Sequence, residues 1–377
     1  MKKSKILCLL MIFGIAMSAF GIEVTGTAPT VSAPTVSDEP YATQIQNALD
    51  DAFQQGTDTV IGDLNEMVGG IAPIPKQLIQ AFGNSSVYAS HGATNRGYGG
   101  YKALSINIGT MVGVQLPVGP FEIVNALDTI PDRLLSNGDL PLGANPQLFN
   151  AHVGFNASFL VKNLYLGVRL GFLDLPKGSI QIDSMGDFSK NLSFKTTTIG
   201  VTANYQLIPS ISLAGLITWR GINIGSGIIF STSNLNFAMP LDFDPFDLGS
   251  GATLNIDPEI TFDLSMTTVT IPVEAVTAIK LLFINIPIGV GADIAFGKTD
   301  MRVGMDAAIN VDAPGLTQES PGSLSVSAGG SMAPQFLNLK LMTGLGFVFG
   351  PVVLDIPVTW YFADNGFNVG ITLGVSF

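Results

Sequence analysis

The chain has 377 residues, of which 47% are hydrophobic and only 12% are charged, with a mean hydropathy of +0.43. This composition is too apolar for an average soluble domain of this size, and the formal net charge of −12 argues against a nucleic-acid partner. Beyond the N-terminal region no stretch approaches about twenty uninterrupted apolar residues, so a spanning helix does not explain the apolarity. A closed β-barrel is the other structure that can cross a bilayer.

The N-terminus has the features of a secretory signal peptide. Basic residues among the first five positions precede an apolar run over 6–20, and a small-residue cleavage motif ends at Gly21. We therefore predict that residues 1–21 direct export and are removed by cleavage near Gly21. The single cysteine, Cys8, lies within this run, so we expect the mature chain to lack disulfides and thiolate chemistry.

Two segments precede the predicted strands. Residues 22–40 form a linker that repeats Ala-Pro-Thr-Val-Ser, a composition that favours extended, weakly ordered chain. Residues 41–100 form a predicted N-terminal helical segment, in which Ile45, Leu49 and Phe53 recur at a spacing of four. This apolar stripe needs a surface to cover. Two interpretations remain open, a plug in the mouth of a barrel or a periplasmic cap outside it.

Strand-like alternation dominates residues 101–377. From Phe367 to Phe377 every second side chain is large and apolar, and the residues between them are small or polar. Because strand side chains alternate between two faces, one face is apolar and the other is not. We predict an all-β fold, an antiparallel up-and-down transmembrane barrel of about 12 strands (10–14). The runs lie at 104–114, 153–159, 164–172, 199–205, 211–219, 269–279, 284–296, 303–311, 324–326, 337–349, 352–362 and 367–377.

A chain with this pattern that ends on an aromatic strand resembles the bacterial outer-membrane β-barrel class. The resemblance implies an outer-membrane location, contact with its lipid, and recognition of the strand ending at Phe377 by the barrel assembly machinery. Counting back from that strand places four tight links on the periplasmic side and three long loops outside, the asymmetry expected of the class. The loops, which are candidates for contacting a host or surface ligand, are 117–150, 174–197 and 231–267.

A soluble secreted barrel or sandwich would also alternate, but its outer face would need many charged residues. Here the less apolar face is mostly Gly, Ser, Thr, Asn and Ala, which favours a membrane barrel with this face inward. The few charges on it are candidates for a constriction that selects solutes. The competing interpretation is an ion-pair network that closes a narrow lumen or contacts the N-terminal segment. These residues are Arg169, Arg220, Glu274, Asp293, Arg302, Asp306, Lys340 and Asp355.

Catalytic and metal chemistry is weakly indicated. His152 lies on the polar face of its strand, but no serine stands at position 150 or 154 to complete a nucleophilic pair, so we predict no enzymatic activity and no cofactor. The other histidine, His91, lies in a Gly/Asn-rich stretch, and two histidines without a mature cysteine do not support a dedicated zinc site. Three acidic residues are loose calcium candidates, with a solvated acidic loop as the alternative. They are Asp242, Asp244 and Asp247.

Two classes of function remain. The first is a porin-like channel for small or hydrophobic solutes, gated in one version by the N-terminal segment. That version is similar to the outer-membrane fatty-acid transporter family, in which an N-terminal plug precedes the strands. Asn145-Pro146 here follows the first strand, and about twelve strands is fewer than that family uses, so no ligand-binding residue is carried over. The second class is a surface-exposed adhesin or structural barrel with a closed lumen, acting through its long outer loops.

Overall fold

The structure is a computed structural model that describes most of the chain after residue 102 and parts of the chain before it. The predicted signal peptide and most of residues 33–74 lie outside the described residues. Among the residues that the structure describes, no helix is long and apolar enough to span a membrane. The described residues are 22–27, 30–32, single positions between 40 and 51, 75–91, 103–116, 142–179, 191–213, 216–240, 245–249, 252–312, 314 and 317–377.

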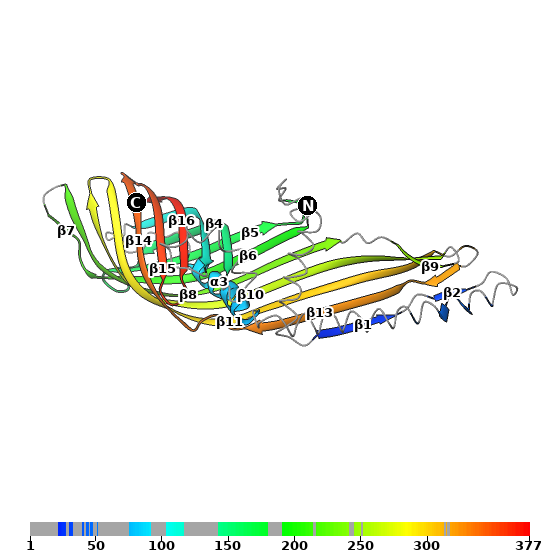
Figure 1. The fold of residues 1–377 in the computed structure, drawn as a ribbon. Coiled ribbons are helices and arrows are strands. Elements are labelled where there is room, and N and C mark those ends of the chain that lie inside the picture. Colours follow the sequence, from blue (N-terminus) through cyan, green and yellow to red (C-terminus); the bar gives the residue numbers. More distant parts are fainter. Residues whose placement is uncertain are drawn as a thin grey trace, which may run out of the picture.

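Ten antiparallel strands close into a barrel (Figure 1). Around the ring the order is β11, β14, β15, β16, β3, β4, β5, β6, β8 and β10, and the pairing of β10 with β11 closes it. The predicted all-β antiparallel barrel is thus confirmed, at the lower limit of the predicted range of strand numbers. The ring strands are β3 (Leu104–Gln115), β4 (Gly143–Asn156), β5 (Leu164–Leu175), β6 (Leu192–Ile208), β8 (Ile217–Pro240), β10 (Ala252–Leu281), β11 (Ile284–Asp312), β14 (Leu337–Phe349), β15 (Val352–Tyr361) and β16 (Gly366–Ser376).

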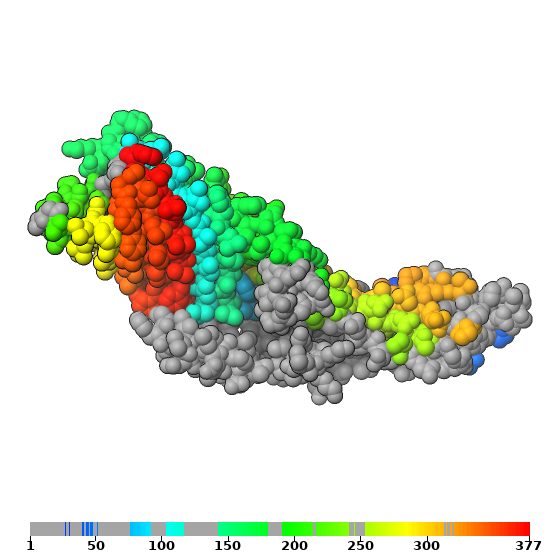
Figure 2. Space-filling model, turned by 90° about the horizontal axis from the view of Figure 1, so that it is seen from above, coloured from blue at the N-terminus to red at the C-terminus, as the bar shows by residue number. Residues whose placement is uncertain are grey.

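Several ring strands run far beyond the barrel and form a second region, which we call the extension (Figures 1 and 2). It consists of residues 192–197 of β6, 231–240 of β8, 252–267 of β10 and 297–312 of β11, together with shorter strands that pair only there. β13 pairs with the distal half of β11, and β1 pairs with β13. The shorter strands of the extension are β1 (Ile22–Thr27), β2 (Thr30–Ser32), β9 (Phe246–Gly249), β12 (Thr317–Ser320) and β13 (Gly322–Met332).

The strand count differs from the predicted twelve for two reasons. The predicted strands 284–296 and 303–311 are one continuous strand, β11, which passes through Gly297 without a turn. The run at 324–326 belongs to β13, which lies outside the ring. The two changes remove two strands and leave an even number, so the predicted direction of each remaining strand still holds.

One of the three predicted long loops is largely strand. The prediction of a loop over 231–267 is wrong, because residues 231–240 continue β8 and residues 252–267 belong to β10. These segments alternate like the rest of their strands, and their polar composition reflects a change of surroundings. The other two predicted loops are shortened, since β4 already begins at Gly143 and β6 at Leu192.

The links between β4 and β5, β10 and β11, and β14 and β15 lie at one end of the barrel, which we call the turn end. One short link, residues 362–365 between β15 and β16, lies at the opposite end. The C-terminus lies there too, because the Phe377 amide donates to the Leu104 carbonyl over 2.9 Å and the Ser376 amide to that of Pro351 over 2.7 Å. Asn163 and Gly350, with φ angles of 66° and 62°, allow two of the links to be tight. A two-stranded outgrowth, β7 (Ile211–Ser212) paired with β8, is found at this end.

The apolar face of the strands changes side where the barrel passes into the extension. Along β11, Ile288 and Val290 point outward from the barrel and are 55% and 59% exposed, whereas Asp293 points inward and is fully buried. Farther along the same strand the inward positions are apolar, with Met301 and Val303 at 3% and 2% exposure. The outward positions there are polar or charged, among them Lys298, Asp300, Arg302 and Asp306.

The change occurs at one level on four adjacent strands. Phe296 pairs with Val269, Val269 with Phe230, and Phe230 with Ile199, so these outward apolar residues form one row across the sheet. The next outward row is polar: Thr197, Thr232, Thr267 and Lys298. We call the line between these two rows the boundary. Direct cross-strand partners share a face, so the register alone fixes the boundary as a line across the sheet.

Candidate functional site

The helix α3 (Pro75–Ser90) occupies the barrel interior, which we treat as the first candidate site. It contacts six ring strands, β3, β4, β8, β10, β11 and β16, as well as β13, so strands surround it. Its C-terminal half is sequestered from solvent: Ser85, Ser86, Tyr88 and Ser90 are all fully buried. The described barrel interior is therefore filled by a segment of the same chain at this level.

The sequence of α3 follows the polarity of the wall around it. Its first half contributes Ile79, with Leu78 and Phe82, to an apolar cluster that includes Met266 and Met301 at the base of the extension. Its second half is Gly-Asn-Ser-Ser followed by Val-Tyr-Ala-Ser, and it lies deeper in the barrel, where inward wall residues are polar or small. The helix thus crosses the boundary with an apolar end on one side and a polar end on the other.

Glycines in the wall let the strands approach the helix closely. A Cβ atom at Gly113 would lie 2.4 Å from both the Ala89 nitrogen and the Ser85 oxygen, distances that real Cβ atoms do not adopt. At Gly143 the corresponding Cβ would lie 2.2 Å from the Ala81 carbonyl oxygen. These contacts involve helix backbone, which cannot rotate away, so the wall is shaped for a helix at this position.

Hydrogen bonds tie the polar half of α3 to the wall. The Asn84 amide donates to Gln115 over 2.9 Å and to Asp364 over 3.1 Å, and its oxygen accepts from the Gln335 backbone amide over 2.7 Å. The Arg169 guanidinium donates to the Ser90 carbonyl over 2.9 Å, which satisfies an acceptor at the helix C-terminus. Buried polar groups that are paired in this way fix the helix in one position.

Burial changes the ionisation of two groups next to these contacts. Burial raises the pKa of the Tyr88 hydroxyl well above its usual value, and the nearby carboxylates of Asp364 and Asp293 raise it further. Burial also raises the pKa of Asp364, which lies in the link between β15 and β16. Tyr88 therefore stays neutral, and its ring stacks on Tyr361 with centroids 3.9 Å apart.

A buried charge cluster lies where α3 ends. The His91 Nε2 atom is 2.6 Å from a carboxylate oxygen of Asp293 on β11, and Nδ1 is 3.9 Å from Glu274 on β10. The Lys340 ammonium on β14 is 2.6 Å from Glu274 and 2.5 Å from Asp293. When His91 is protonated, its charge balances the second carboxylate, so the residue that follows α3 completes the cluster.

Metal binding and ion pairing are the two possible uses of this cluster. His91, Glu274 and Asp293 offer ligand atoms within 4.8 Å of one another, close enough to share a metal ion. The Lys340 ammonium, however, already contacts both carboxylates and would repel a divalent cation. The geometry therefore favours ion pairs that hold the end of α3 against three wall strands.

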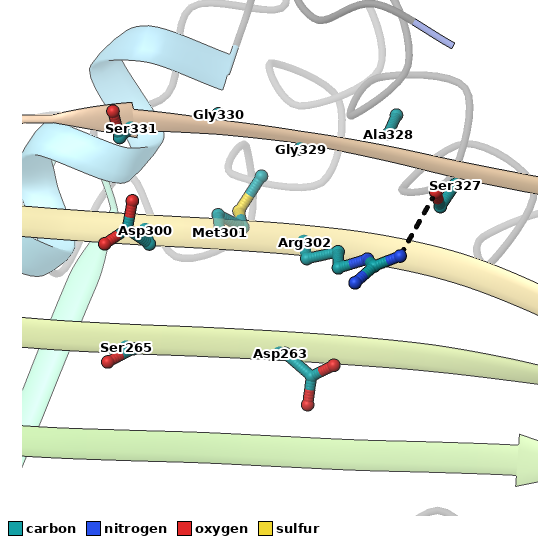
Figure 3. A pocket seen from close by; sticks show the side chains of 10 residues that line it. All are labelled: Asp263, Ser265, Asp300, Met301, Arg302, Ser327, Ala328, Gly329, Gly330 and Ser331. Atoms are coloured by element: carbon teal, nitrogen blue, oxygen red, sulfur yellow. Dashed lines mark hydrogen bonds between the residues drawn. The ribbon is translucent and has the colours of Figure 1, made fainter. Parts of the chain in front are cut away.

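The second candidate site is a groove on the outward, polar face of the extension (Figure 3). It has a volume of about 520 Å³ and is lined by side chains from β10, β11 and β13. Arg302 reaches toward Ser327, with 3.4 Å between the guanidinium and the hydroxyl, as the dashed line in Figure 3 shows. Asp263 lies on the neighbouring strand and accepts from Asn236 over 2.5 Å. Exposed hydroxyl, carboxylate and guanidinium groups make this a surface for polar contacts.

Comparison with known proteins places the chain in a family. The profile of the Lsa36-like family matches residues 29–377. The chain belongs to the Lsa36-like family. No curated protein matches the sequence of this Lsa36-like chain.

Solved structures match the chain with low TM-scores. The chain is similar to the translocator domain of the autotransporter NalP from Neisseria meningitidis, with 9% identity, 77% of this chain and 91% of that chain covered, and a TM-score of 0.28. It is also similar to the CymD monoaromatic hydrocarbon channel, with 12% identity, 74% and 89% covered and a TM-score of 0.25. A third is Ail, the attachment invasion locus protein of Yersinia pestis, with 12% identity, 74% and 98% covered and a TM-score of 0.20.

The structure divides the eight inward charges predicted for this Lsa36-like chain. Arg169, Asp293, Lys340 and Asp355 are buried in the barrel at 2% exposure or less. Glu274 joins them with its side chain 10% exposed, and Arg220 on β8 is half-buried. Two residues lie elsewhere, because the polar face turns outward beyond the boundary. These two, Arg302 and Asp306, are exposed on the outward face of the extension.

The remaining predicted residues have a mixed placement. His152 is buried on the inner wall at 5% exposure, with Nε2 3.5 Å from the Thr202 hydroxyl. Of the calcium candidates, Asp242 and Asp244 lie outside the described residues, and Asp247 lies on β9. Nothing in the sequence singled out His91, or residues 75–90 within the predicted helical segment 41–100, because a polar helix with glycine and serine has no strong periodic signal.

Proposed function

We propose that this chain is an outer-membrane β-barrel, closed by its own helix, that anchors the extension at the cell surface as a module for interaction with other molecules. The observation that carries the proposal is the boundary. A strand that is apolar outside and polar inside suits a barrel in lipid, and a strand with the reverse pattern suits a structure in water. Both patterns occur on the same uninterrupted strands.

The dimensions of the barrel support a membrane location. The twelve steps from Ile284 to Phe296 on β11 correspond to roughly 28 Å along the membrane normal, at ~3.3 Å per residue and a tilt of ~45°. Aromatic pairs mark both ends of this band, as expected of interfacial girdles. Phe283 stacks with Phe349 at the turn end, and Phe296 packs edge-to-face on Phe336 at the boundary, each pair with centroids 5.4 Å apart.

The orientation follows from the links. Outer-membrane barrels have short periplasmic turns and keep long connections outside, so the turn end is assigned to the periplasm and the extension to the exterior. The fifteen steps from Gly297 to Asp312 then carry β11 roughly 50 Å farther along the strand, at ~3.3 Å per residue. The polar groove beside Arg302 lies on this part, accessible to large partners.

Labelling of intact cells tests the orientation. In a Cys8→Ser background, Ser265→Cys places one thiol in the outward groove, and Lys162→Cys places one at the turn end. We expect a membrane-impermeant maleimide to label Ser265→Cys in intact cells and Lys162→Cys only after permeabilisation. The opposite pattern would show that the extension faces the periplasm.

Planar-bilayer conductance tests the closure. We expect the full chain to be silent, because α3 fills the lumen, and a chain that lacks residues 22–91 to conduct. Steady conductance by the full chain would contradict a closed barrel.

A gated channel is the second candidate, and one observation favours it. The deep contacts between α3 and the wall are hydrogen bonds and ion pairs, so the wall stays wettable if the helix leaves. Gly113→Leu, which forces a side chain into the helix backbone, then produces channel openings in the otherwise intact chain. Silence of this variant in a folded barrel would argue against gating.

A further inference from the structure

The order of contacts along α3 gives its direction through the barrel. Gly83, in the middle of the helix, lies against Thr299 and Pro334, beside the base of the extension. His91, directly after the helix, pairs with Asp293, six residues nearer the turn end along the same strand. The chain therefore enters the ring from the extension and proceeds toward the turn end.

The described residues on either side of α3 lie at opposite ends of the barrel. Before the helix, β1 pairs with β13 and β2 with β12, both on the extension. After it, the Ala103 carbonyl accepts from the Asn156 amide over 3.0 Å, and Leu104 pairs with Phe377, both at the turn end. A closed ring of ten strands separates the two ends.

We propose that β1 and β2 lie outside the cell and that the barrel holds α3 as a threaded segment, so that the lumen is the passage through which the chain presents this N-terminal part. The inference rests on the orientation given under the proposed function. A signal peptide delivers the N-terminus to the periplasm, whereas β1 and β2 lie on the exterior extension, and the ring interior is the path that joins them.

The sequence of this N-terminal part suits passage in an extended form. Residues 22–74 contain no cysteine, so no disulfide can lock a bulky loop before passage. Their duplicated Ala-Pro-Thr-Val-Ser stretch favours extended chain. Once outside, β1 adds a strand to β13, and side-chain contacts secure both strands: Thr27 to Ser323 over 3.2 Å and Thr30 to Ser320 over 2.7 Å.

The fit of α3 explains why passage stops there. Gly113 and Gly143 admit the helix backbone, and His91 contacts both carboxylates of the cluster formed by Glu274, Asp293 and Lys340. A stretch of extended chain with another sequence has neither a helix backbone that fits these glycines nor a histidine that contacts the cluster. The threaded helix is thus retained by contacts specific to its own sequence.

Thiol labelling tests the threading independently of the proposed function. In the Cys8→Ser background, Thr27→Cys puts an exposed thiol on β1, with Ser265→Cys and Lys162→Cys as exterior and periplasmic references. We expect Thr27→Cys to be labelled equally in intact and permeabilised cells, as Ser265→Cys is. Labelling of Thr27→Cys only after permeabilisation, with Ser265→Cys labelled in intact cells, would overturn the threading and leave the proposed function standing. Labelling of Lys162→Cys alone in intact cells would overturn both.

A cross-link covers the case in which Thr27→Cys is not labelled in either preparation. The double variant Thr30→Cys/Ser320→Cys places two thiols on directly paired residues, where a disulfide is sterically possible. We expect mild oxidation of intact cells to give a faster-migrating, reducible species on a non-reducing gel. Absence of that species, while both single variants fold, would also overturn the threading.

Discussion

The barrel and the extension are made of the same strands and yet present opposite faces to their surroundings. On β11, Ile288 points outward in the barrel and Met301 points inward in the extension, although backbone pairing with β10 is unbroken between them. The fold therefore does not set which face is apolar. The surroundings do, because a face in lipid must be apolar and a face in water polar.

The two regions also differ in where their charges lie, because the barrel buries charges in its interior and the extension exposes them. The strongest test of this difference is to remove one charge from each region. Asp293→Ala in the barrel leaves Lys340 and His91 facing only Glu274, and breaking a buried pair costs about 3–5 kcal/mol. Asp306→Ala removes an exposed carboxylate that accepts from Ser325 on the extension, and we expect a cost below ~1 kcal/mol. Urea unfolding in detergent micelles measures both. Equal costs would show that the barrel charges are not truly buried.

Removal of a buried side chain should destabilise the protein more in the apolar interior of the extension than in the polar interior of the barrel. Leu264 and Thr268 lie on the same inward face of β10, four residues apart on the two sides of the boundary, and both are buried. Leu264→Ala opens a cavity in the apolar cluster of the extension and should cost about 2–5 kcal/mol. Thr268→Ala loses one weak contact to Ser86 and should cost ~1 kcal/mol. A small effect at Leu264 would mean that the extension has no packed core.

The strands of the barrel wall could be predicted from the sequence because period-two alternation depends only on residues close together in the chain. This prediction failed at Gly297, where the apolar positions of β11 move from even numbers, such as Ile294 and Phe296, to odd ones, such as Val303 and Met305. The apolar positions move from even to odd numbers in the same way whether one strand changes its apolar face or a turn separates two strands. Only cross-strand register distinguishes them, and register is not readable from a single chain.

The interior site was predicted in part. The inward placement of Asp293 and Lys340 followed from alternation, and the alternative of an ion-pair network in contact with the N-terminal segment matches the cluster around His91. Within the predicted helical segment 41–100, the helix that precedes His91 could not be located, because Gly83 and the polar residues that follow have low helix propensity. Contacts with the surrounding wall stabilise it, and those are tertiary.

The outward faces provide a matched comparison on one strand. Ile288 and Ala308 are both exposed outward positions of β11, one in the barrel and one in the extension. Ile288→Arg should destabilise the barrel in lipid by about 2–4 kcal/mol, because it places a charge in the hydrocarbon band. Ala308→Arg should change stability by less than ~0.5 kcal/mol. Unfolding in liposomes measures both, and a similar cost at Ala308 would move the membrane edge beyond the boundary.

The smallest effect is expected for a surface ion pair just beyond the boundary. Lys298 and Asp300 lie 2.6 Å apart, with their side chains 63% and 48% exposed, whereas His91 and Asp293 are at the same separation and fully enclosed. Water screens the exposed pair, so Asp300→Asn should change the unfolding free energy by less than ~0.5 kcal/mol, and added salt should reduce the difference further. A cost comparable to that of Asp293→Ala would place Lys298 in a low-dielectric environment. Lipid would then reach past the row of Thr197, Thr232 and Thr267, and the water-exposed part of β11 would begin closer to Arg302.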